Sequence, residues 1–399
     1  MSYVLSALLL ICTLWFVARW MPAGSEARMP LPYALALVRF LWIPYAILAV
    51  WAAIAGLWWQ CIVAVIGVGA VWASQLPYWR HIGAHLTKKQ SNRDRYCETE
   101  SGNDHNQQRE TYRETLGLSC NIMTLNCRYG HADPNEIIEA VRDRHISVLA
   151  LQELSSDLVA ELTAQGLDQL LPYCQLGKAR ETDNGGFNGI WTNVQPVATT
   201  HSIVPIPAAD VPAVTLAVAT TDNLNAVATP RYITFASAHT KSPMRGCREW
   251  SAGIIGLGAL ADGEYHDIES ITAHTDGEHP ALNDNFQVAN SMNKGTTNTV
   301  TTNTANTAIT AANTATVVLG DLNAGLDHPS FRALLRHGLH DASLSEAHGP
   351  NFTFPSWITW PRIELDHALA TDEVTFSHIK SFTITNTDHL ALIATLSIR

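Results

Sequence analysis

Two kinds of apolar pattern divide the chain. Residues 3–18, 33–53 and 57–76 form nearly continuous apolar runs, whereas short apolar runs alternate with polar segments from residue 116 onward. A helix that crosses a bilayer needs about 20 apolar residues. We therefore expect a transmembrane anchor of three helices over residues 1–79, and tryptophans near several run ends fit interfacial belts. A signal peptide is the alternative for the first run, but no Lys or Arg precedes that run and two further runs follow it.

The region after the apolar runs has the pattern of a layered α/β domain. Asp133 and Pro134 mark a helix start as N-cap and first residue, Glu136 occupies the capping-box position, and Ile137, Ile138 and Val141 form the apolar face. Residues 146–151 are continuously apolar, which is typical of a strand buried on both faces. The predicted strands cover residues 119–126, 146–151, 189–197, 231–240, 315–320, 365–370 and 390–398.

Two polar stretches set the domain limits. Residues 80–115 are polar and lack apolar periodicity, which predicts a linker. Residues 116–399 then form one domain, interrupted at about residues 262–316 by an insertion that ends in a Thr-, Asn- and Ala-rich segment. Such a segment has too little apolar bulk to offset the entropy of ordering it, so we expect a surface excursion.

Charge is distributed unevenly between these parts. Only 15% of the residues are charged, against about 25% in an ordinary globular chain. Residues 1–79 contain three arginines and one glutamate, a net charge of +2, and the remainder has a net charge of −13. This composition excludes a strongly basic protein that coats nucleic acid.

We expect the protein to lie in the cell membrane through a multi-pass anchor. The positions of Lys and Arg then bear on which face carries the large domain. Lys and Arg near the predicted helix ends favour the cytoplasmic face for the large domain. Related three-span proteins suggest the outer face, and the sequence leaves both open.

Polar residues with catalytic chemistry follow the predicted strands. Asn126, Glu153 and His239 lie at strand ends, and five more residues follow or begin other strands: Asp321, Asn323, Asp366, Asp388 and His389. Because strand ends converge on one rim of a sheet, these side chains are expected to form one site.

The motifs TLN126, LQE153, GDLNA at 320–324, IELDHAL around Asp366 and TDH at 387–389 resemble the endonuclease/exonuclease/phosphatase superfamily. The resemblance covers residues 118–399 and implies a four-layer α/β/β/α sandwich, two β-sheets flanked by helices. It also implies hydrolysis of phosphate esters at one end of the sheets.

The resemblance assigns a role to each site residue. Glu153 is the expected direct Mg²⁺ ligand, helped by Asn126 and Asp388, because Mg²⁺ prefers carboxylate and amide oxygens; Mn²⁺ is the second candidate. Asp321 would orient or deprotonate the attacking water, and Asn323 would bind a phosphate oxygen. Asp366 would orient His389 at the phosphate, with His239 as a second phosphate-facing histidine. Which group serves as the base stays open.

Three functions compete at this stage. The first is a membrane-anchored, metal-dependent phosphodiesterase or phosphatase, acting on a lipid, nucleotide or nucleic-acid phosphate ester. The second is an endonuclease or exonuclease of the same fold. Abasic-site nucleases of this superfamily, however, commonly carry Asp and Tyr where this sequence has Arg128 and His239. The third is a non-catalytic module tethered to the lipid bilayer. No protein partner is inferred.

Other residues and loops are expected to pack, to lie at the surface or to contact the substrate. We expect a packing role for His367 and surface or loop positions for His131, His328, His337, His340 and His348. Trp357 and Trp360 are interpreted as either a substrate lip or packing residues. Loops at 175–188, 241–246 and 349–362 are expected to select the substrate.

Overall fold

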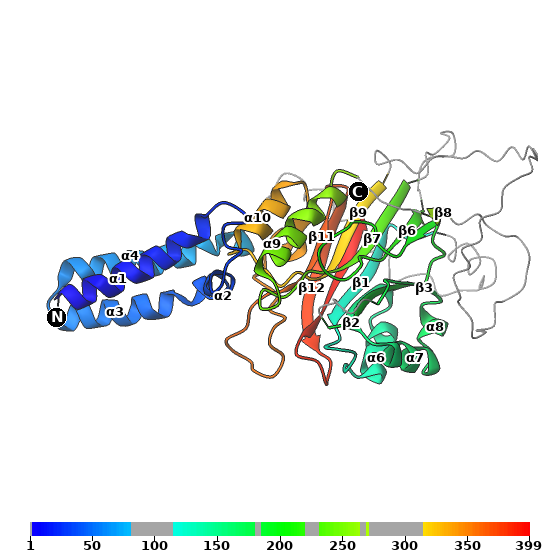
Figure 1. The fold of residues 1–399 in the computed structure, drawn as a ribbon, viewed down its shortest axis with the longest axis horizontal. Coiled ribbons are helices and arrows are strands. Elements are labelled where there is room, and N and C mark those ends of the chain that lie inside the picture. Colours follow the sequence, from blue (N-terminus) through cyan, green and yellow to red (C-terminus); the bar gives the residue numbers. More distant parts are fainter. Residues whose placement is uncertain (1, 81–114, 180–184, 220–230, 264–268, 271–313) are drawn as a thin grey trace, which may run out of the picture.

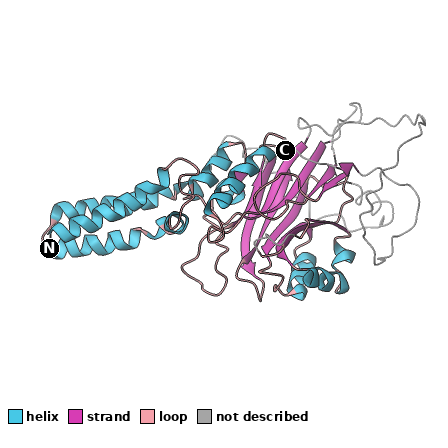
Figure 2. Cartoon of the chain, in the orientation of Figure 1, coloured by secondary structure: helices cyan, strands magenta, loops and turns pink. Residues whose placement is uncertain are grey.

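Two mixed β-sheets pack face to face and carry helices on both outer surfaces, as Figures 1 and 2 show. The computed structural model describes residues 2–80, 115–179, 185–219, 231–263, 269–270 and 314–399. We call residues 115–399 the body and residues 2–80 the projection, because the latter form an elongated helical extension from one end of the body (Figure 1). The predicted linker falls almost wholly outside the described residues, as does most of the predicted insertion.

The first sheet has the strand order β12-β13-β1-β2-β4-β3. Its central strands β1 and β2 are parallel, and its other neighbours are antiparallel. The strands are β1 (Ser119–Asn126), β2 (Ile146–Leu154), β3 (Tyr173–Leu176), β4 (Phe187–Thr192), β12 (Val374–Thr383) and β13 (Leu390–Ile398).

The second sheet has the order β10-β11-β9-β7-β6-β5-β8, again with one central parallel pair, β7 and β9. Its strands are β5 (Ala198–Thr200), β6 (Ala213–Val218), β7 (Arg231–His239), β8 (Glu269–Ser270), β9 (Thr314–Asp321), β10 (His340–Asp341) and β11 (Asp366–Ala370).

Three apolar clusters hold the body together and define its four layers. Ile122 and Val148 of the first sheet pack against Phe235 and Val317 of the second. On the outer face of the first sheet lie α6 (Pro134–Asp143), α7 (Ser156–Ala164) and α8 (Leu167–Leu170). On the outer face of the second lie α9 (Cys247–Gly256) and α10 (Pro329–Arg336), while the short α11 (Ala342–Glu346) follows β10. The predicted two-sheet sandwich is confirmed.

The start of α6 confirms the predicted N-cap but not the capping box. Asp133 caps α6 by accepting hydrogen bonds from the backbone N–H groups of Asn135 and Glu136. Glu136 does not close the capping box: its carboxylate accepts from the backbone N–H (2.7 Å) and the hydroxyl (2.9 Å) of Thr385. A contact between segments distant in sequence has taken the place of a local one.

The projection contains α1 (Ser2–Val17), α2 (Leu31–Ala36), α3 (Trp42–Ile54) and α4 (Trp58–Ser74). Among the described residues, one continuous helical stretch, Ser2–Trp20, is long and apolar enough to cross a membrane. The stretches Val38–Ile54 and Trp58–Ser74 are shorter. The prediction of three spanning helices, and with it the multi-pass assignment, is therefore not supported.

The physical reason is that backbone turns shorten the second and third apolar runs. A 3₁₀ turn at Val38–Phe40 separates α2 from α3, and another at Leu76–Trp79, which contains Pro77, follows α4. Proline at the start of such a turn cannot continue the hydrogen bonding of the preceding helix.

Candidate active site

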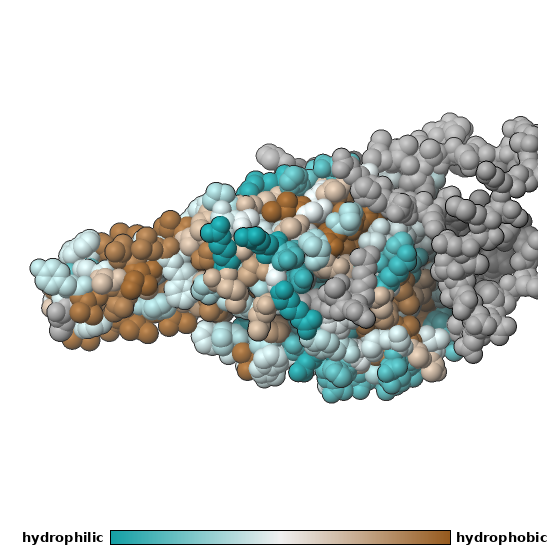
Figure 3. Space-filling model, viewed as in Figure 1, coloured by the Kyte–Doolittle hydropathy of each residue, from teal (hydrophilic) through white to brown (hydrophobic). Residues whose placement is uncertain are grey.

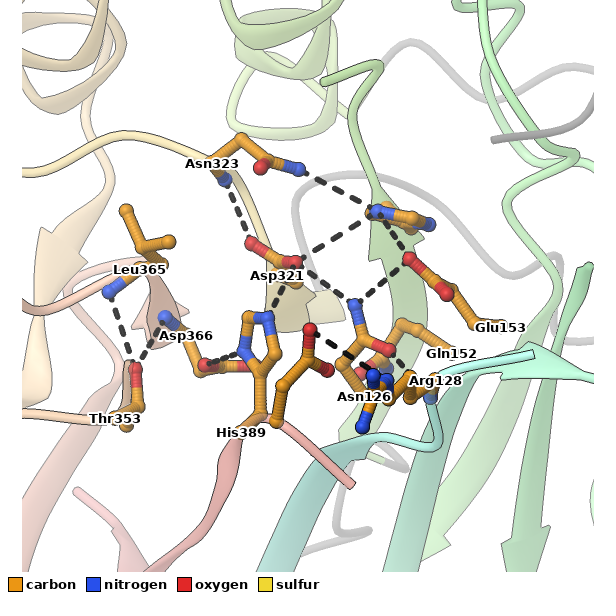
Figure 4. A network of polar contacts seen from close by, with 12 residues as sticks. Asn126, Arg128, Gln152, Glu153, Asp321, Asn323, Thr353, Leu365, Asp366 and His389 are labelled. Carbon is orange, nitrogen blue, oxygen red and sulfur yellow. Dashed lines mark hydrogen bonds and ion pairs between the residues drawn. The ribbon is translucent and has the colours of Figure 1, made fainter. Parts of the chain in front are cut away.

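Six of the eight residues predicted for the site lie together in Figure 4: Asn126, Glu153, Asp321, Asn323, Asp366 and His389. The other two adjoin them, because His239 pairs with Asp321 and Asp388 precedes His389. The strand pairing brings them together. Asp321 pairs with His239 of the parallel neighbour β7 and with Asp366 of the antiparallel neighbour β11. Asn126 and Gln152 pair in the same way across β1 and β2. The register thus places side chains from six segments at one edge of the sandwich.

Gly320 allows the close pairing of β7 and β9 beside Asp321. Its φ is +149°, and a Cβ at this position would lie 1.8 Å from the carbonyl oxygen of Ala238. Only a residue without a side chain fits there, because real Cβ atoms do not approach an oxygen so closely.

Asn126 joins the two sheets. Its Nδ2 donates to Asp321 Oδ2 at 2.9 Å and to Glu153 Oε1 at 3.2 Å. Its Oδ1 accepts from the backbone N–H of Arg128 at 2.9 Å. The amide therefore separates two carboxylates that would otherwise repel each other.

A bulge directs Glu153 toward the site. Side chains alternate along a strand, so Gln152 and Glu153 would face opposite sides of the sheet. The pairing of β2 with β4 shifts between Leu151 and Leu154, and Glu153 has φ +52°. The side chain turns toward Asn126, and its Oε2 accepts from the backbone N–H of Tyr129 at 3.1 Å. Burial raises the pKa of this carboxyl, against the hydrogen bond from Asn126.

Asp366 and His389 form a short, buried pair. Asp366 Oδ2 lies 2.7 Å from His389 Nδ1. Burial alone would lower the pKa of His389, but the carboxylates of Asp366 and Asp321 outweigh it and raise the pKa to about 10. His389 is therefore an imidazolium at neutral pH, and its ring packs against Phe354 at a centroid distance of 5.0 Å.

Asp321 lies between the two site histidines. Its Oδ2 is 3.6 Å from His389 Nε2 and 3.7 Å from His239 Nε2, and its Oδ1 accepts from the backbone N–H of Asn323 at 2.8 Å. Burial raises the pKa of Asp321, while His389 opposes that shift. A carboxylate of raised pKa is a stronger base than an ordinary aspartate.

His239 and Asn323 are the remaining polar residues beside Asp321. His239 is fully buried, and burial lowers its pKa, which favours the neutral ring. Its Nε2 is 3.4 Å from Asn323 Nδ2, and Asn323 Nδ2 also donates to the carbonyl of Thr240 at 3.2 Å. Asn323 has φ +49°, a left-handed conformation that Asn tolerates better than most residues.

Asp388 occupies the more exposed rim, with its Oδ2 3.9 Å from Arg128 Nε. Its charge acts on Glu153, whose pKa it helps to raise. The two carboxylates and the amide of Asn126 are oxygen donors of the kind a hard divalent cation prefers. This donor set therefore fits the predicted metal, with the carboxylates as the stronger ligands because Asn126 Oδ1 already accepts a hydrogen bond.

Besides the buried group Asp321, Asp366 and His389 of the site, a second buried group of metal-binding residue types does not fit a metal. It contains Asp341, Glu364 and His367. His367 Nδ1 lies 2.8 Å from Asp341 Oδ2, and its Nε2 lies 2.7 Å from the carbonyl oxygen of Ala324. Both ring nitrogens face acceptors, so His367 donates twice and has no lone pair for a cation. The structure thus gives His367 the structural role predicted for it.

Several residues that support the site were not predicted. Thr387 Oγ1 donates to the carbonyl of Asn126 at 2.6 Å and ties the TDH segment to β1. Thr353 Oγ1 accepts from the backbone N–H of Asp366 at 3.1 Å. Gln152 Nε2 donates to Ser237 Oγ at 2.9 Å and links the sheets behind the site. Thr387 and Gln152 belong to motifs that marked the site, whereas no local signal indicates Thr353.

Two of the histidines assigned to surface or loop positions have other surroundings. His340 lies in the short strand β10 and is half-buried, and His328 lies in a loop that is covered. His328 is buried, and its Nε2 lies 2.9 Å from the carbonyl of Pro32 in the projection. The sequence of the loop gave no sign that another segment would cover it.

The fold and the site define a four-layer α/β/β/α sandwich with an acidic and histidine-rich end. The chain matches the Endonuclease/Exonuclease/phosphatase family over residues 123–389 and belongs to that family. Members of the family are hydrolases of phosphate esters, and enzymes of this fold depend on divalent metals.

Solved structures of similar fold include a humanized variant of TDP2 from D. rerio, with 13% identity and a TM-score of 0.43 over 70% of this chain and 99% of that one. An endonuclease/exonuclease/phosphatase from Bacteroides vulgatus has 11% identity and a TM-score of 0.44 over 70% and 99%. A mannosyl-6-phosphatase from Bacteroides thetaiotaomicron has 11% identity and a TM-score of 0.43 over 70% and 100%. No curated protein sequence matches this chain.

Proposed function

We propose that this protein is a membrane-anchored, divalent-metal-dependent hydrolase of phosphate esters. The observation that carries the proposal is the Asp366–His389 pair at 2.7 Å, with His389 Nε2 facing Asp321 and a separate carboxylate, Glu153, across the site. The pair supplies a fixed cation, and the opposite side supplies oxygen ligands for a metal. The imidazolium and the metal ion would both stabilise the negative charge that develops on the oxygens of a phosphate ester during hydrolysis.

Each residue then has a chemical task. Asp366 holds His389 in one orientation and keeps it protonated, so that His389 Nε2–H binds a phosphate oxygen. Asp321, with its raised pKa, takes a proton from the attacking water. Asn323 and neutral His239 bind phosphate oxygens from the other side of Asp321.

Glu153 and Asp388 would hold the metal, with Asn126 beside them. When bound, the ion supplies Lewis-acid stabilisation to a phosphoryl oxygen. Mg²⁺ is the first choice because the donors are all oxygens, and Mn²⁺ is the second.

The projection is proposed as the membrane anchor. Its outer surface is apolar (Figure 3), with exposed side chains such as Leu10, Ile11, Val50 and Val65. Exposed aromatic residues lie at both ends: Tyr3, Trp58 and Trp59 near the N-terminal tip, and Trp20 and Trp72 near the body. Tyr3 and Trp20 are about 26 Å apart along the helix at 1.5 Å per residue, close to the thickness of a hydrocarbon layer.

Hydrolysis of bis(p-nitrophenyl) phosphate by the detergent-solubilised full chain tests the catalytic proposal. We expect turnover with Mg²⁺, loss of turnover in excess EDTA, and recovery when Mg²⁺ is restored. His389→Ala should lower kcat by about 10²-fold or more, because it removes the imidazolium that binds a phosphate oxygen.

His348→Ala is the matched control, since His348 is an exposed histidine of the body. It should retain wild-type turnover. Equal turnover by His389→Ala and wild type, or none by wild type in excess metal, would contradict the assignment.

A further inference from the structure

Two loops border the candidate site, and both rest on the projection. The loop between α11 and β11, residues 347–365, runs beside the base of the projection (Figure 1). In it, Trp360 packs edge-on against Phe40 at a centroid distance of 5.9 Å, and the Phe352 ring lies 4.3 Å from the guanidinium carbon of Arg39. The loop after β7 is contacted by Tyr33, which hydrogen-bonds with Ser242.

The first of these loops is also joined to the reacting groups. The backbone N–H of Ser356 donates to the carbonyl of Asp388 at 2.8 Å, and Ser356 Oγ donates to the carbonyl of Thr387 at 2.7 Å. Phe354 packs on the ring of His389. The same short loop therefore touches the end of the projection and the site.

Exposed apolar side chains of the body gather around this site. Of the described residues from 115 onward, four large apolar side chains are exposed: Tyr129 (49%), Met244 (77%), Trp357 (66%) and Trp360 (61%). Met244 and the two tryptophans lie on the two loops just described. Tyr129 donates its backbone N–H to Glu153 and its hydroxyl is bonded to Arg245, so it too borders the site.

Basic residues accompany these side chains although the domain is acidic. Lys241 and Arg245 lie on the loop after β7, and Arg39 lies at the base of the projection. Tryptophan favours the layer of lipid headgroups, because its ring is amphipathic, and basic side chains are attracted to anionic headgroups.

We propose that the active site opens toward the membrane surface and acts on the phosphate ester of a lipid headgroup, with Trp357, Trp360 and Met244 lying in the headgroup layer. This inference rests on the proposed function. In the reaction, water forms a new bond to phosphorus, one ester P–O bond breaks, and the leaving alcohol oxygen takes a proton. A bilayer lipid reaches such a site by lateral movement, because the projection holds the body close to the bilayer.

Photo-crosslinking tests the orientation independently of headgroup chemistry. The full chain, with p-benzoylphenylalanine at position 357 or 360, is reconstituted in vesicles of phosphatidylcholine, phosphatidylethanolamine, phosphatidylglycerol and phosphatidylinositol. Both positions should label lipid as strongly as position 65, which is exposed on the projection. The matched control is position 161 on α7, which lies on the side of the body away from the projection. Labelling at 357 and 360 no stronger than at 161 would overturn the proposal.

Hydrolysis in the same vesicles tests the substrate class. Wild type should convert vesicle lipid to a phosphorylated or alcoholic product detected by mass spectrometry. The double variant Trp357→Ala/Trp360→Ala should reduce turnover of vesicle lipid about tenfold more than turnover of bis(p-nitrophenyl) phosphate, a ratio that corresponds to about 1.4 kcal/mol.

Turnover of the soluble substrate distinguishes a failure of the lipid proposal from a failure of the proposed function. Turnover of bis(p-nitrophenyl) phosphate without any lipid product refutes the lipid substrate but not the proposed hydrolase activity. Faster cleavage of a single-stranded oligonucleotide than of any vesicle lipid has the same meaning. No turnover of either substrate in excess Mg²⁺ refutes the proposed function itself.

Discussion

Two Asp–His pairs with nearly equal geometry have different surroundings. Asp366–His389 is joined at 2.7 Å and faces Asp321 and the site, whereas Asp341–His367 is joined at 2.8 Å and its second nitrogen is bonded to the carbonyl of Ala324. The Nε2 of the first pair faces the site, 3.6 Å from Asp321 Oδ2, where it can meet a substrate. In the second pair both ring nitrogens of His367 bond to groups of the protein, so the pair stabilises the loop that follows Asp321.

The first residue-scale prediction concerns Asp366→Asn. Without the carboxylate, His389 loses the partner that keeps it charged and oriented, so kcat on bis(p-nitrophenyl) phosphate should fall by about 10²-fold or more. Asp341→Asn, which removes the carboxylate of the other pair, is the control and should cost stability rather than kcat. Wild-type kcat in Asp366→Asn would refute the role given to the pair.

A second prediction at the residue scale is that folding stability depends on pH through His367. Burial lowers its pKa, but the hydrogen bond and charge of Asp341 outweigh burial and raise the pKa to about 9. A histidine in the unfolded chain has a pKa of about 6.5, so the folded state binds a proton more tightly. The stabilisation of about 3 kcal/mol is complete below about pH 6.5 and is lost as the pH rises through 9.

Urea unfolding of wild type and His367→Gln measures this effect. The difference in unfolding free energy between them should be larger at pH 6 than at pH 10. A difference that does not change with pH would show that the imidazolium contributes nothing to stability.

At the scale of elements, the parallel pairs β1–β2 and β7–β9 make the site, because their carboxyl ends meet at one edge. The β2 bulge and Gly320 adjust this edge by turning Glu153 inward and by letting β9 approach β7. A site built on strand ends is rigid, which suits catalysis that depends on fixed distances.

Gly320→Ala tests the approach of β7 and β9. The added methyl group would collide with the carbonyl of Ala238, so the strands must separate, and we expect a loss of more than about 2 kcal/mol in unfolding free energy. Turnover should fall as well, because His239 and Asp321 move apart.

Gly253→Ala in α9 is the matched control. The nearest atom to its new methyl group would be 3.6 Å away, an ordinary contact, and alanine favours a helix by about 1 kcal/mol over glycine. Its stability should be unchanged or higher, and a similar loss in both variants would contradict the argument.

At the scale of the whole molecule, buried polar contacts fix the projection to the body. Arg19 and Asp327 form a 3.0 Å ion pair with side-chain exposures of 7% and 8%. Glu26 is fully buried and accepts from the backbone N–H and the hydroxyl of Ser330, both at 2.6 Å. Because Asp327 and Ser330 follow the loop that carries Asp321 and Asn323, the junction adjoins the site.

Arg19→Ala tests this junction. Removing one partner leaves Asp327 buried without its cation, which typically costs about 3–5 kcal/mol. The cost should appear as separation of the projection from the body, measured by faster limited proteolysis between residues 20 and 31. Arg28→Ala, in an exposed position of the same connection, should leave the cleavage rate unchanged. Equal rates in both variants would show that the ion pair does not hold the junction.

Much of the body was predictable because its signals are local. The strands at 119–126 and 390–398 have the predicted bounds, and the cap at Asp133 forms as expected. The strands β3, β5, β6 and β12 were not predicted, and the strand predicted at 189–197 ends at Thr192. Short segments such as β3 and β5 have no distinctive period. The eight residues proposed for the site were predicted from motifs, whereas the bulge at Glu153 and the support from Thr353 depend on partners in other segments of the chain.

The sequence by itself determined the division into an apolar N-terminal part and an acidic α/β body, and the residue types of the site, because apolar periodicity and motif spacing are properties of the chain. Tertiary structure decided the lengths of the apolar helices, the separate surroundings of His389 and His367, and the contact of the loops at 240–246 and 347–365 with the projection. These features arise from packing between segments that can be more than 300 residues apart, such as Glu26 and Ser330. No local pattern specifies which of the possible partners a side chain will meet.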